Sequence, residues 1–171
     1  MIFKTNRLIV RTLKQSDADS FYLMMSNPNV MNPIPQKVFT RVESDAKLSD
    51  LIAQESSSTK KLWAITEKEN DTLIGICGLI KNDENDDEIV YRLSEVYWGI
   101  GYGTEIAKGL IHYAFEILKL YLLTADVNVE NVKSAKILDK FMTPVREFFN
   151  EGDNCVDRRY VLRKGDWLQE E

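Results

Sequence analysis

The chain has 171 residues, 44% of them hydrophobic, and carries a formal net charge of −5. This much apolar material can form one core, so we expect a single domain over residues 1–171. A negative charge argues against nucleic-acid binding as the main task, because that binding needs clustered Lys and Arg. No apolar run resembles a signal peptide or reaches membrane-spanning length, so we expect a cytoplasmic protein without a membrane partner.

The first part of the chain is predicted to form one strand followed by two helices. A short strand is predicted at Arg7–Arg11, and Ser16 resembles the cap of a helix that continues through Met25. The segment Asn27–Phe39 contains three prolines and is expected to be a loop without regular helix. Thr40 and Glu43 form a capping box before a second amphipathic helix, which ends near Gln54.

A group of strands follows. Leu62–Thr66 and Leu73–Ile80 are apolar segments on either side of a turn, which is typical of a hairpin. The acidic run Asn82–Glu88 is most simply a solvated turn, and Ile89–Leu93 is predicted to be another strand.

The clearest helix of the sequence comes next. Its apolar stripe has helical spacing and consists of Ile106, Ala107, Leu110, Ile111, Ala114, Phe115 and Leu118. Tyr121–Ala125 is predicted to be a buried strand, Asn131 caps a further helix with Ala135, Leu138 and Met142 inward, and two final strands flank Glu151–Asn154. This order predicts a mixed sheet with helices on its faces.

The two cysteines, the histidine and two arginines near the end of the chain do not indicate a catalytic or metal site. Cys77 and Cys155 lie far apart and form no CxxC pair, so we expect two reduced thiols and no metal site. His112 falls off the apolar stripe of its helix and is expected to face solvent. Arg158 and Arg159 lie in a terminal strand, where surface charges are the default interpretation.

The main functional signal is a glycine-rich loop between a strand and the long helix. Gly99, Gly101 and Gly103 place free N–H groups at the positive end of the helix dipole, which favours an anion. A Cβ at these positions would keep a phosphate away from the main chain. The dinucleotide fingerprint needs glycine at Thr104, and the P-loop needs Lys followed by Ser or Thr after its last glycine, a pair that is absent here, so both are excluded. The remaining alternative is a glycine turn that only reverses the chain.

The loop also resembles a known motif. Trp98, Gly101 and Gly103 match the first, fourth and sixth positions of R/Q-x-x-G-x-G/A, the pyrophosphate-binding motif of the GNAT superfamily of N-acetyltransferases, and Trp at the first position is typical of the RimJ/RimL type. Three further stretches match in order: Thr5-Asn6-Arg7-Leu8 with Arg11 and Asp17-Ala18, Trp63-Ala64-Ile65 with Ile74-Gly75, and Glu130-Asn131 with Ser134.

The resemblance implies an α/β fold with a mixed, mostly antiparallel sheet, helices on both faces, and acetyl-CoA as the donor. The strand ending at Leu93 would splay from Tyr121–Ala125, and Leu93 would offer backbone groups to the pantetheine arm in that gap. Asn131, which is alternatively a plain helix cap, would lie near the thiol. The residues implied to hold the pyrophosphate are Trp98, Gly99, Ile100, Gly101, Tyr102, Gly103 and Thr104.

Acetyl transfer to an amine requires a neutral amine, a stabilised thioester oxygen and a protonated leaving thiolate. We hypothesise that Ser134 hydrogen-bonds or protonates the sulfur and that Glu88 accepts the amine proton, directly or through water. The alternatives are an ordinary helix-surface serine and a solvated glutamate. A tyrosine that serves as the acid in other branches is replaced by Leu138, and Met142 stands where the family has Gly.

The expected function is therefore acetyl transfer to a primary amine, by direct attack in a ternary complex. The acceptor is a protein N-terminus or a small molecule such as a polyamine, amino acid or antibiotic, and the segment 29–36 is where the family shapes its acceptor site. A non-catalytic acyl-CoA sensor of the same fold is the alternative. The chain is expected to be a monomer or a homodimer.

Overall fold

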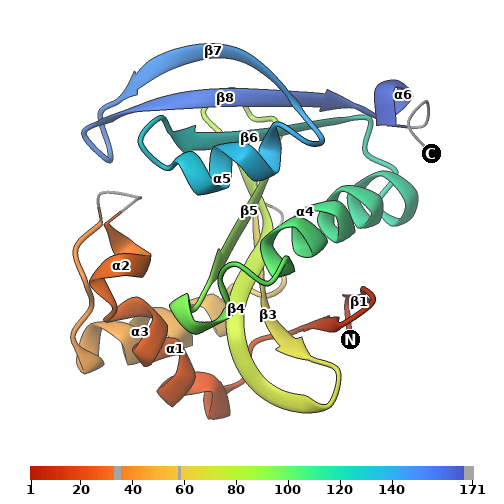
Figure 1. Ribbon diagram of the computed structural model, residues 1–171. Coiled ribbons are helices and arrows are strands. Elements are labelled where there is room, and N and C mark those ends of the chain that lie inside the picture. Colours follow the sequence, from red (N-terminus) through yellow and green to blue (C-terminus); the bar gives the residue numbers. More distant parts are fainter. Residues whose placement is uncertain (33–35, 58, 168–171) are drawn as a thin grey trace.

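The strands of the protein form one twisted sheet in a computed structural model that describes residues 1–32, 36–57 and 59–167 (Figure 1). The spatial order is β1-β2-β3-β4-β5-β6-β8-β7. All neighbours are antiparallel except β5 and β6, which are parallel. The strands are β1 (Phe3–Lys4), β2 (Leu8–Arg11), β3 (Lys60–Glu67), β4 (Asn70–Lys81), β5 (Asp87–Leu93), β6 (Leu122–Asn128), β7 (Thr143–Asn150) and β8 (Cys155–Arg163).

Helices cover both faces of the sheet, as expected. They are α1 (Ala18–Met25), α2 (Pro28–Met31), α3 (Arg41–Ala53), α4 (Tyr102–His112), α5 (Val132–Leu138) and α6 (Lys164–Trp167). On one face, buried residues of α1 and α3 such as Phe21 and Leu48 share a cluster with Ala64 of β3. On the other face, Ile106 of α4 packs in a separate cluster with Ile65 of β3. Consecutive residues of a strand point to opposite faces, so the two clusters lie on opposite sides of the sheet.

The mixed, mostly antiparallel α/β sheet is thus confirmed, and so are the hairpin of β3 and β4, the capping box at Thr40 and the long helix α4. The apolar stripe of that helix is buried except for the half-buried Leu118, and α4 continues into a π-helical turn over Tyr113–Ile117. His112 is exposed and both cysteines are free thiols, again as expected. None of the helices in the described ranges has the length and apolar character that a bilayer crossing requires.

Some local expectations were wrong. Asn27–Phe39 includes the one-turn helix α2, because Pro28 occupies the first helical turn and the Asn27 side chain accepts from the Asn29 N–H; its other prolines, at 33 and 35, lie outside the described residues. Tyr121 is 78% exposed and precedes β6. Arg159 is buried rather than on the surface, because carboxylates of Asp126 and of the acidic run surround its guanidinium.

Candidate active site

The parallel strands β5 and β6 separate soon after they meet. Within the described chain they pair only at Glu88 and Thr124. The Thr124 hydroxyl donates to the Asp87 carbonyl at 3.2 Å, which helps to close this end of the fork. From there β5 runs away from β6 toward α1 and α2 (Figure 1). The sheet therefore has an opening between its two halves, with strand edges on both sides.

The strand register identifies the backbone groups that face this opening. In an antiparallel pair, residues that bond the partner strand alternate with residues whose N–H and C=O groups point away. The Ser94 N–H bonds the Ile74 carbonyl, so Ser94 and Arg92 direct their backbone groups at β4. The backbone groups of Tyr91 and Leu93 consequently point into the fork. The Leu93 carbonyl there accepts from the indole N–H of Trp98 at 2.9 Å, whereas no described residue bonds the Leu93 N–H.

The glycine-rich loop lies at the open end of the fork. Gly99 and Gly101 have φ angles of 78° and 88°, in the left-handed region that favours glycine. Among the described residues, none accepts a hydrogen bond from the backbone N–H groups of residues 99–104. The space where a Gly99 Cβ would lie is open to a distance of 4 Å. The loop is thus a cradle of main-chain donors at the N-terminus of α4, which is suited to a pyrophosphate.

A polar network behind the loop holds its backbone in this orientation. Arg7 donates from Nη1 to the Ile100 carbonyl at 2.9 Å and from Nε to Glu105 at 2.7 Å. The same carboxylate accepts from the Thr5 hydroxyl at 2.6 Å. The Tyr102 ring, which is buried, lies 4.5 Å from the Arg7 guanidinium. The loop carbonyl therefore faces the protein, and Tyr102 has only its backbone to offer to a ligand.

Helix α5 forms the opposite wall of the fork. The Asn131 side chain caps the helix by accepting from the Ser134 N–H at 3.3 Å, as the plain-cap interpretation required. The Ser134 hydroxyl lies 3.3 Å from the Tyr91 hydroxyl, and either oxygen can be the donor. Burial raises the pKa of Tyr91 to about 12, so its hydroxyl stays protonated at neutral pH. Ser134 is therefore paired across the fork and is more than a helix-surface residue.

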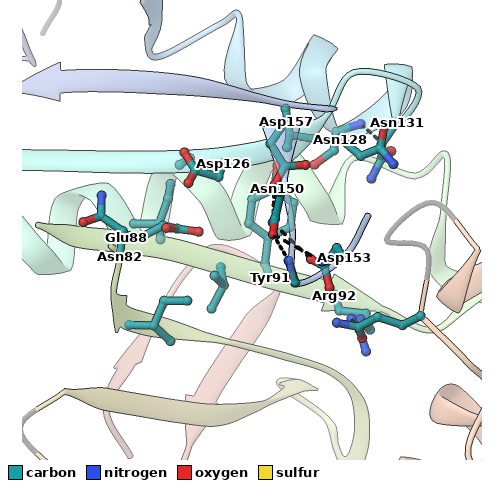
Figure 2. A pocket seen from close by; sticks show the side chains of 18 of the residues that line it. Asn82, Glu88, Tyr91, Arg92, Asp126, Asn128, Asn131, Asn150, Asp153 and Asp157 are labelled. Atoms are coloured by element: carbon teal, nitrogen blue, oxygen red, sulfur yellow. Dashed lines mark hydrogen bonds between the residues drawn. The ribbon is translucent and has the colours of Figure 1, made fainter. Parts of the chain in front are cut away.

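Two cavities meet at this point. A cavity of about 690 Å³ lies between the glycine-rich loop and α5, with Leu93, Trp98 and Gly103 in its lining. A larger one of about 1080 Å³, drawn in Figure 2, extends from β7 and β8 to residues of α1 and α3 such as Met25 and Leu51. The residues that line both are Tyr91, Arg92, Asn131 and Ser134. This arrangement suits a reaction between two substrates that enter from different sides.

Glu88 faces the larger cavity from β5. Its side chain is buried, which contradicts the interpretation as a solvated end of the acidic run. Burial, with a further contribution from the charge of Asp126, raises the pKa of Glu88 to about 8. A carboxylate whose pKa is near neutrality can accept a proton from an amine at physiological pH.

The far wall of the larger cavity is formed by β7 and β8. Asn150 donates to Asp157 at 2.7 Å, and both side chains point into the cavity (Figure 2). Arg159 binds Asp126 and Asp83 at 2.7 Å each and so ties the acidic turn before β5 to β8. This wall is consequently acidic and rigidly bonded.

The structure brings most of the expected site residues together. The smaller cavity is lined by Leu93, Trp98, Gly99, Gly103, Asn131 and Ser134. Thr104 accepts from Lys140 at 3.2 Å at the start of α4. Sequence reasoning missed Tyr91 and Arg92. The alternation of side chains along β5 was the available signal, because it sends Tyr91 to the α5 side and Arg92 to the α1 side.

Comparisons with known proteins agree with this geometry. The profile of the acetyltransferase (GNAT) domain matches residues 7–141. An uncharacterized N-acetyltransferase of Bacillus licheniformis, p20, is 33% identical over 138 residues, which cover 79% of this chain and 78% of that one. YnaD, an uncharacterized N-acetyltransferase of Bacillus subtilis, is 28% identical over 159 residues, or 92% of this chain and 89% of its own.

Solved structures share the fold at lower identity. A GNAT-family acetyltransferase of Bacillus anthracis superposes with a TM-score of 0.82 at 23% identity, covering 95% of this chain and 98% of that one. Spermidine N-acetyltransferase of Vibrio cholerae, solved with coenzyme A and spermine, has a TM-score of 0.77 at 20% identity, with 94% and 98% covered. The family match over most of the sequence and the forked sheet lead to one conclusion: this chain is an acyltransferase that belongs to the GNAT acetyltransferase family.

Proposed function

We propose that this protein transfers the acetyl group of acetyl-CoA to a primary amine by direct attack in a ternary complex. The observation that carries the proposal is the fork itself, in which an unpaired strand edge leads from a cradle of free N–H groups to Ser134. The open space beside Gly99 fits a phosphate that approaches the main chain. The donor supplies an activated acetyl group as its thioester.

The polar groups around the fork have separate tasks in this proposal. Glu88 accepts the proton that the amine loses as its nitrogen bonds to the acetyl carbon. The backbone N–H groups of Tyr91 and Leu93, which point into the fork, stabilise the negative charge on the carbonyl oxygen. Ser134 donates its hydroxyl proton or a hydrogen bond to the sulfur as the carbon–sulfur bond breaks, and Tyr91 orients that hydroxyl.

Placement in the RimJ/RimL branch remains part of the proposal. It is supported by Trp98, whose indole N–H fixes the end of β5 through the Leu93 carbonyl. It is also supported by Arg7, which binds the Ile100 carbonyl of the loop. Both residues lie in the stretches that resemble this branch, and each now has a structural task.

Isothermal titration with acetyl-CoA, followed by a thiol-release assay over a panel of primary amines, tests the proposed function. We expect saturable binding and thiol release that depends on the amine. Binding without release on any amine would instead support a silent acyl-CoA sensor. Absence of binding would refute both functions.

A further inference from the structure

Arg92 is a partly buried guanidinium at the junction of the two cavities. It follows Tyr91 on β5, so its side chain points to the opposite face of the sheet, toward α1 and α2. Its Nη1 donates to the sulfur atoms of Met25 and Met31 at 3.2 and 3.3 Å, and its Nη2 donates to the Gln36 amide oxygen at 3.1 Å. All of these partners are neutral.

The other buried arginines of this chain are paired differently. Arg11 is bonded to the carboxylates of Asp17 and Asp71, and Arg159 is bonded to Asp126 and to the acidic turn before β5. Within residues 1–32, 36–57 and 59–167, Arg92 forms no ion pair. Thioether sulfurs are weak acceptors and do not compensate a buried charge.

Arg92 is nevertheless charged at neutral pH. Burial lowers the pKa of its guanidinium to about 10, and Asp153 acts in the opposite direction. The side chain therefore stays protonated at pH 7 and keeps a donor fork suited to a carboxylate. Figure 2 shows Arg92 at one end of the large cavity and Glu88 with Asp126 at the other. The cavity thus has an unpaired guanidinium near the junction, with the Asp153 carboxylate at the same end, and the carboxylates of Glu88 and Asp126 farther along β5.

We infer that the acceptor is a primary amine that also carries a carboxylate, and that Arg92 binds this carboxylate in the large cavity. The inference deepens the proposed function and rests on it, because it names the acceptor class. The amino group of the same molecule then reaches the junction beside Ser134, and Glu88, farther along β5, accepts its proton through water. A polyamine, which carries only positive charges, would meet the unpaired guanidinium and is disfavoured as an acceptor.

The experiment compares two acceptors that differ only in the negative charge. Initial rates are measured for α- and ω-amino acids and for the carboxamide of each, with the wild-type enzyme, Arg92→Lys and Arg92→Met. The quantity of interest is the ratio of kcat/KM for each acid to that for its amide. Comparing this ratio between enzymes cancels the intrinsic difference in amine basicity.

We expect Arg92→Met to lower the ratio by about tenfold or more, since a charge-assisted bidentate contact is lost. Arg92→Lys should retain part of the preference, because it keeps the charge but not the fork. Arg158→Met is the matched control: Arg158 binds Glu147 on the surface of β7 and β8, so the ratio should not change. Arg92 also lines the smaller cavity, which is proposed to hold the donor. Titration of each variant with acetyl-CoA therefore shows whether donor binding has changed as well.

A ratio that is equal in the wild type and in Arg92→Met would overturn the inference and leave the proposed function intact. Equal or faster acetylation of spermidine than of every amino acid would also overturn it. If no amine in the panel releases thiol although acetyl-CoA binds, the proposed function fails, and the inference fails with it.

Discussion

The two cavities that meet at Ser134 are built from different parts of the polypeptide. The smaller cavity, the proposed donor site, offers main-chain groups, namely the N–H groups of residues 99–104 and the unpaired edge of β5. The larger cavity, the proposed acceptor site, offers side chains of α3, β5, β6, β7 and β8. Side-chain substitutions can therefore alter acceptor choice and catalysis while the donor cradle stays as it is.

Loss of the proposed base should give the largest effect and tests the acceptor side. In Glu88→Gln the amide cannot accept the amine proton, so we expect kcat/KM to fall by about 10²-fold or more. Acetyl-CoA affinity, measured by titration, should remain close to the wild-type value. Glu147→Gln, at the surface of β7, is the matched control and should keep full activity.

The pH profile sharpens this test. Burial raises the pKa of Glu88 to about 8, so wild-type kcat/KM should fall as the pH drops below 8 and the carboxylate takes up a proton. Glu88→Gln should lose that dependence. If Glu88→Gln keeps the wild-type pH profile of kcat/KM and a near wild-type turnover, then Glu88 is not the base.

The raised pKa also means that the Glu88 contribution to stability is present below about pH 4.5 and is lost as the pH rises through 8. At pH 9 the Glu88→Gln variant should therefore unfold at a higher temperature than the wild type.

The contrast between main-chain groups in one cavity and side chains in the other also explains which parts of the site the sequence could predict. Glycines at alternate positions before a helix reveal main-chain chemistry locally, so the loop from Trp98 to Thr104 could be located without a structure. The order of strands and helices likewise predicted the α/β sheet, since hydrophobic periodicity acts over short distances. A single-domain organisation and a cytoplasmic location stay predictions.

Side-chain contacts between residues far apart in the chain could not be predicted from the sequence. Arg159 was interpreted as a surface residue because nothing nearby in the chain indicates that Asp83 and Asp126 converge on it across β6 and β8. The roles of Tyr91 and Arg92 depend on which helix packs on each face of β5. Such contacts join residues more than 30 positions apart, as the Tyr91 to Ser134 and Arg159 to Asp126 pairs do. Only the folded sheet places them together.

A substitution in the cradle should give an intermediate effect, confined to the donor side. In Gly99→Ala the new Cβ has room within the protein, so the folding cost is the positive φ alone, about 1–2 kcal/mol. We expect acetyl-CoA affinity to fall by about tenfold, because the methyl group occupies the space where a phosphate would approach the main chain. The KM for the amine should change little.

Gly165→Ala provides the matched control for the cradle. Gly165 also has open space around its Cβ position, but it lies in α6 and is absent from both cavity linings. Titration should show that the Gly165→Ala variant binds acetyl-CoA with the same affinity as the wild type. If Gly99→Ala binds acetyl-CoA as tightly as Gly165→Ala does, then the phosphate does not lie against the loop.

The smallest effect is expected at the contact where the two cavities join. Tyr91→Phe removes one hydroxyl, so we expect kcat to fall only a few-fold, about what one neutral hydrogen bond is worth. Ser134→Ala is the reference variant: it removes the proposed donor to the sulfur and should lower kcat more than Tyr91→Phe does. Single-turnover rates for both variants and for the double variant measure their coupling. If Tyr91 acts by orienting Ser134, Tyr91→Phe has no further effect once Ser134 is Ala. Additive losses would instead mean that the Tyr91 hydroxyl acts on the reaction by itself, and the 3.3 Å contact between the two oxygens would then have no part in catalysis.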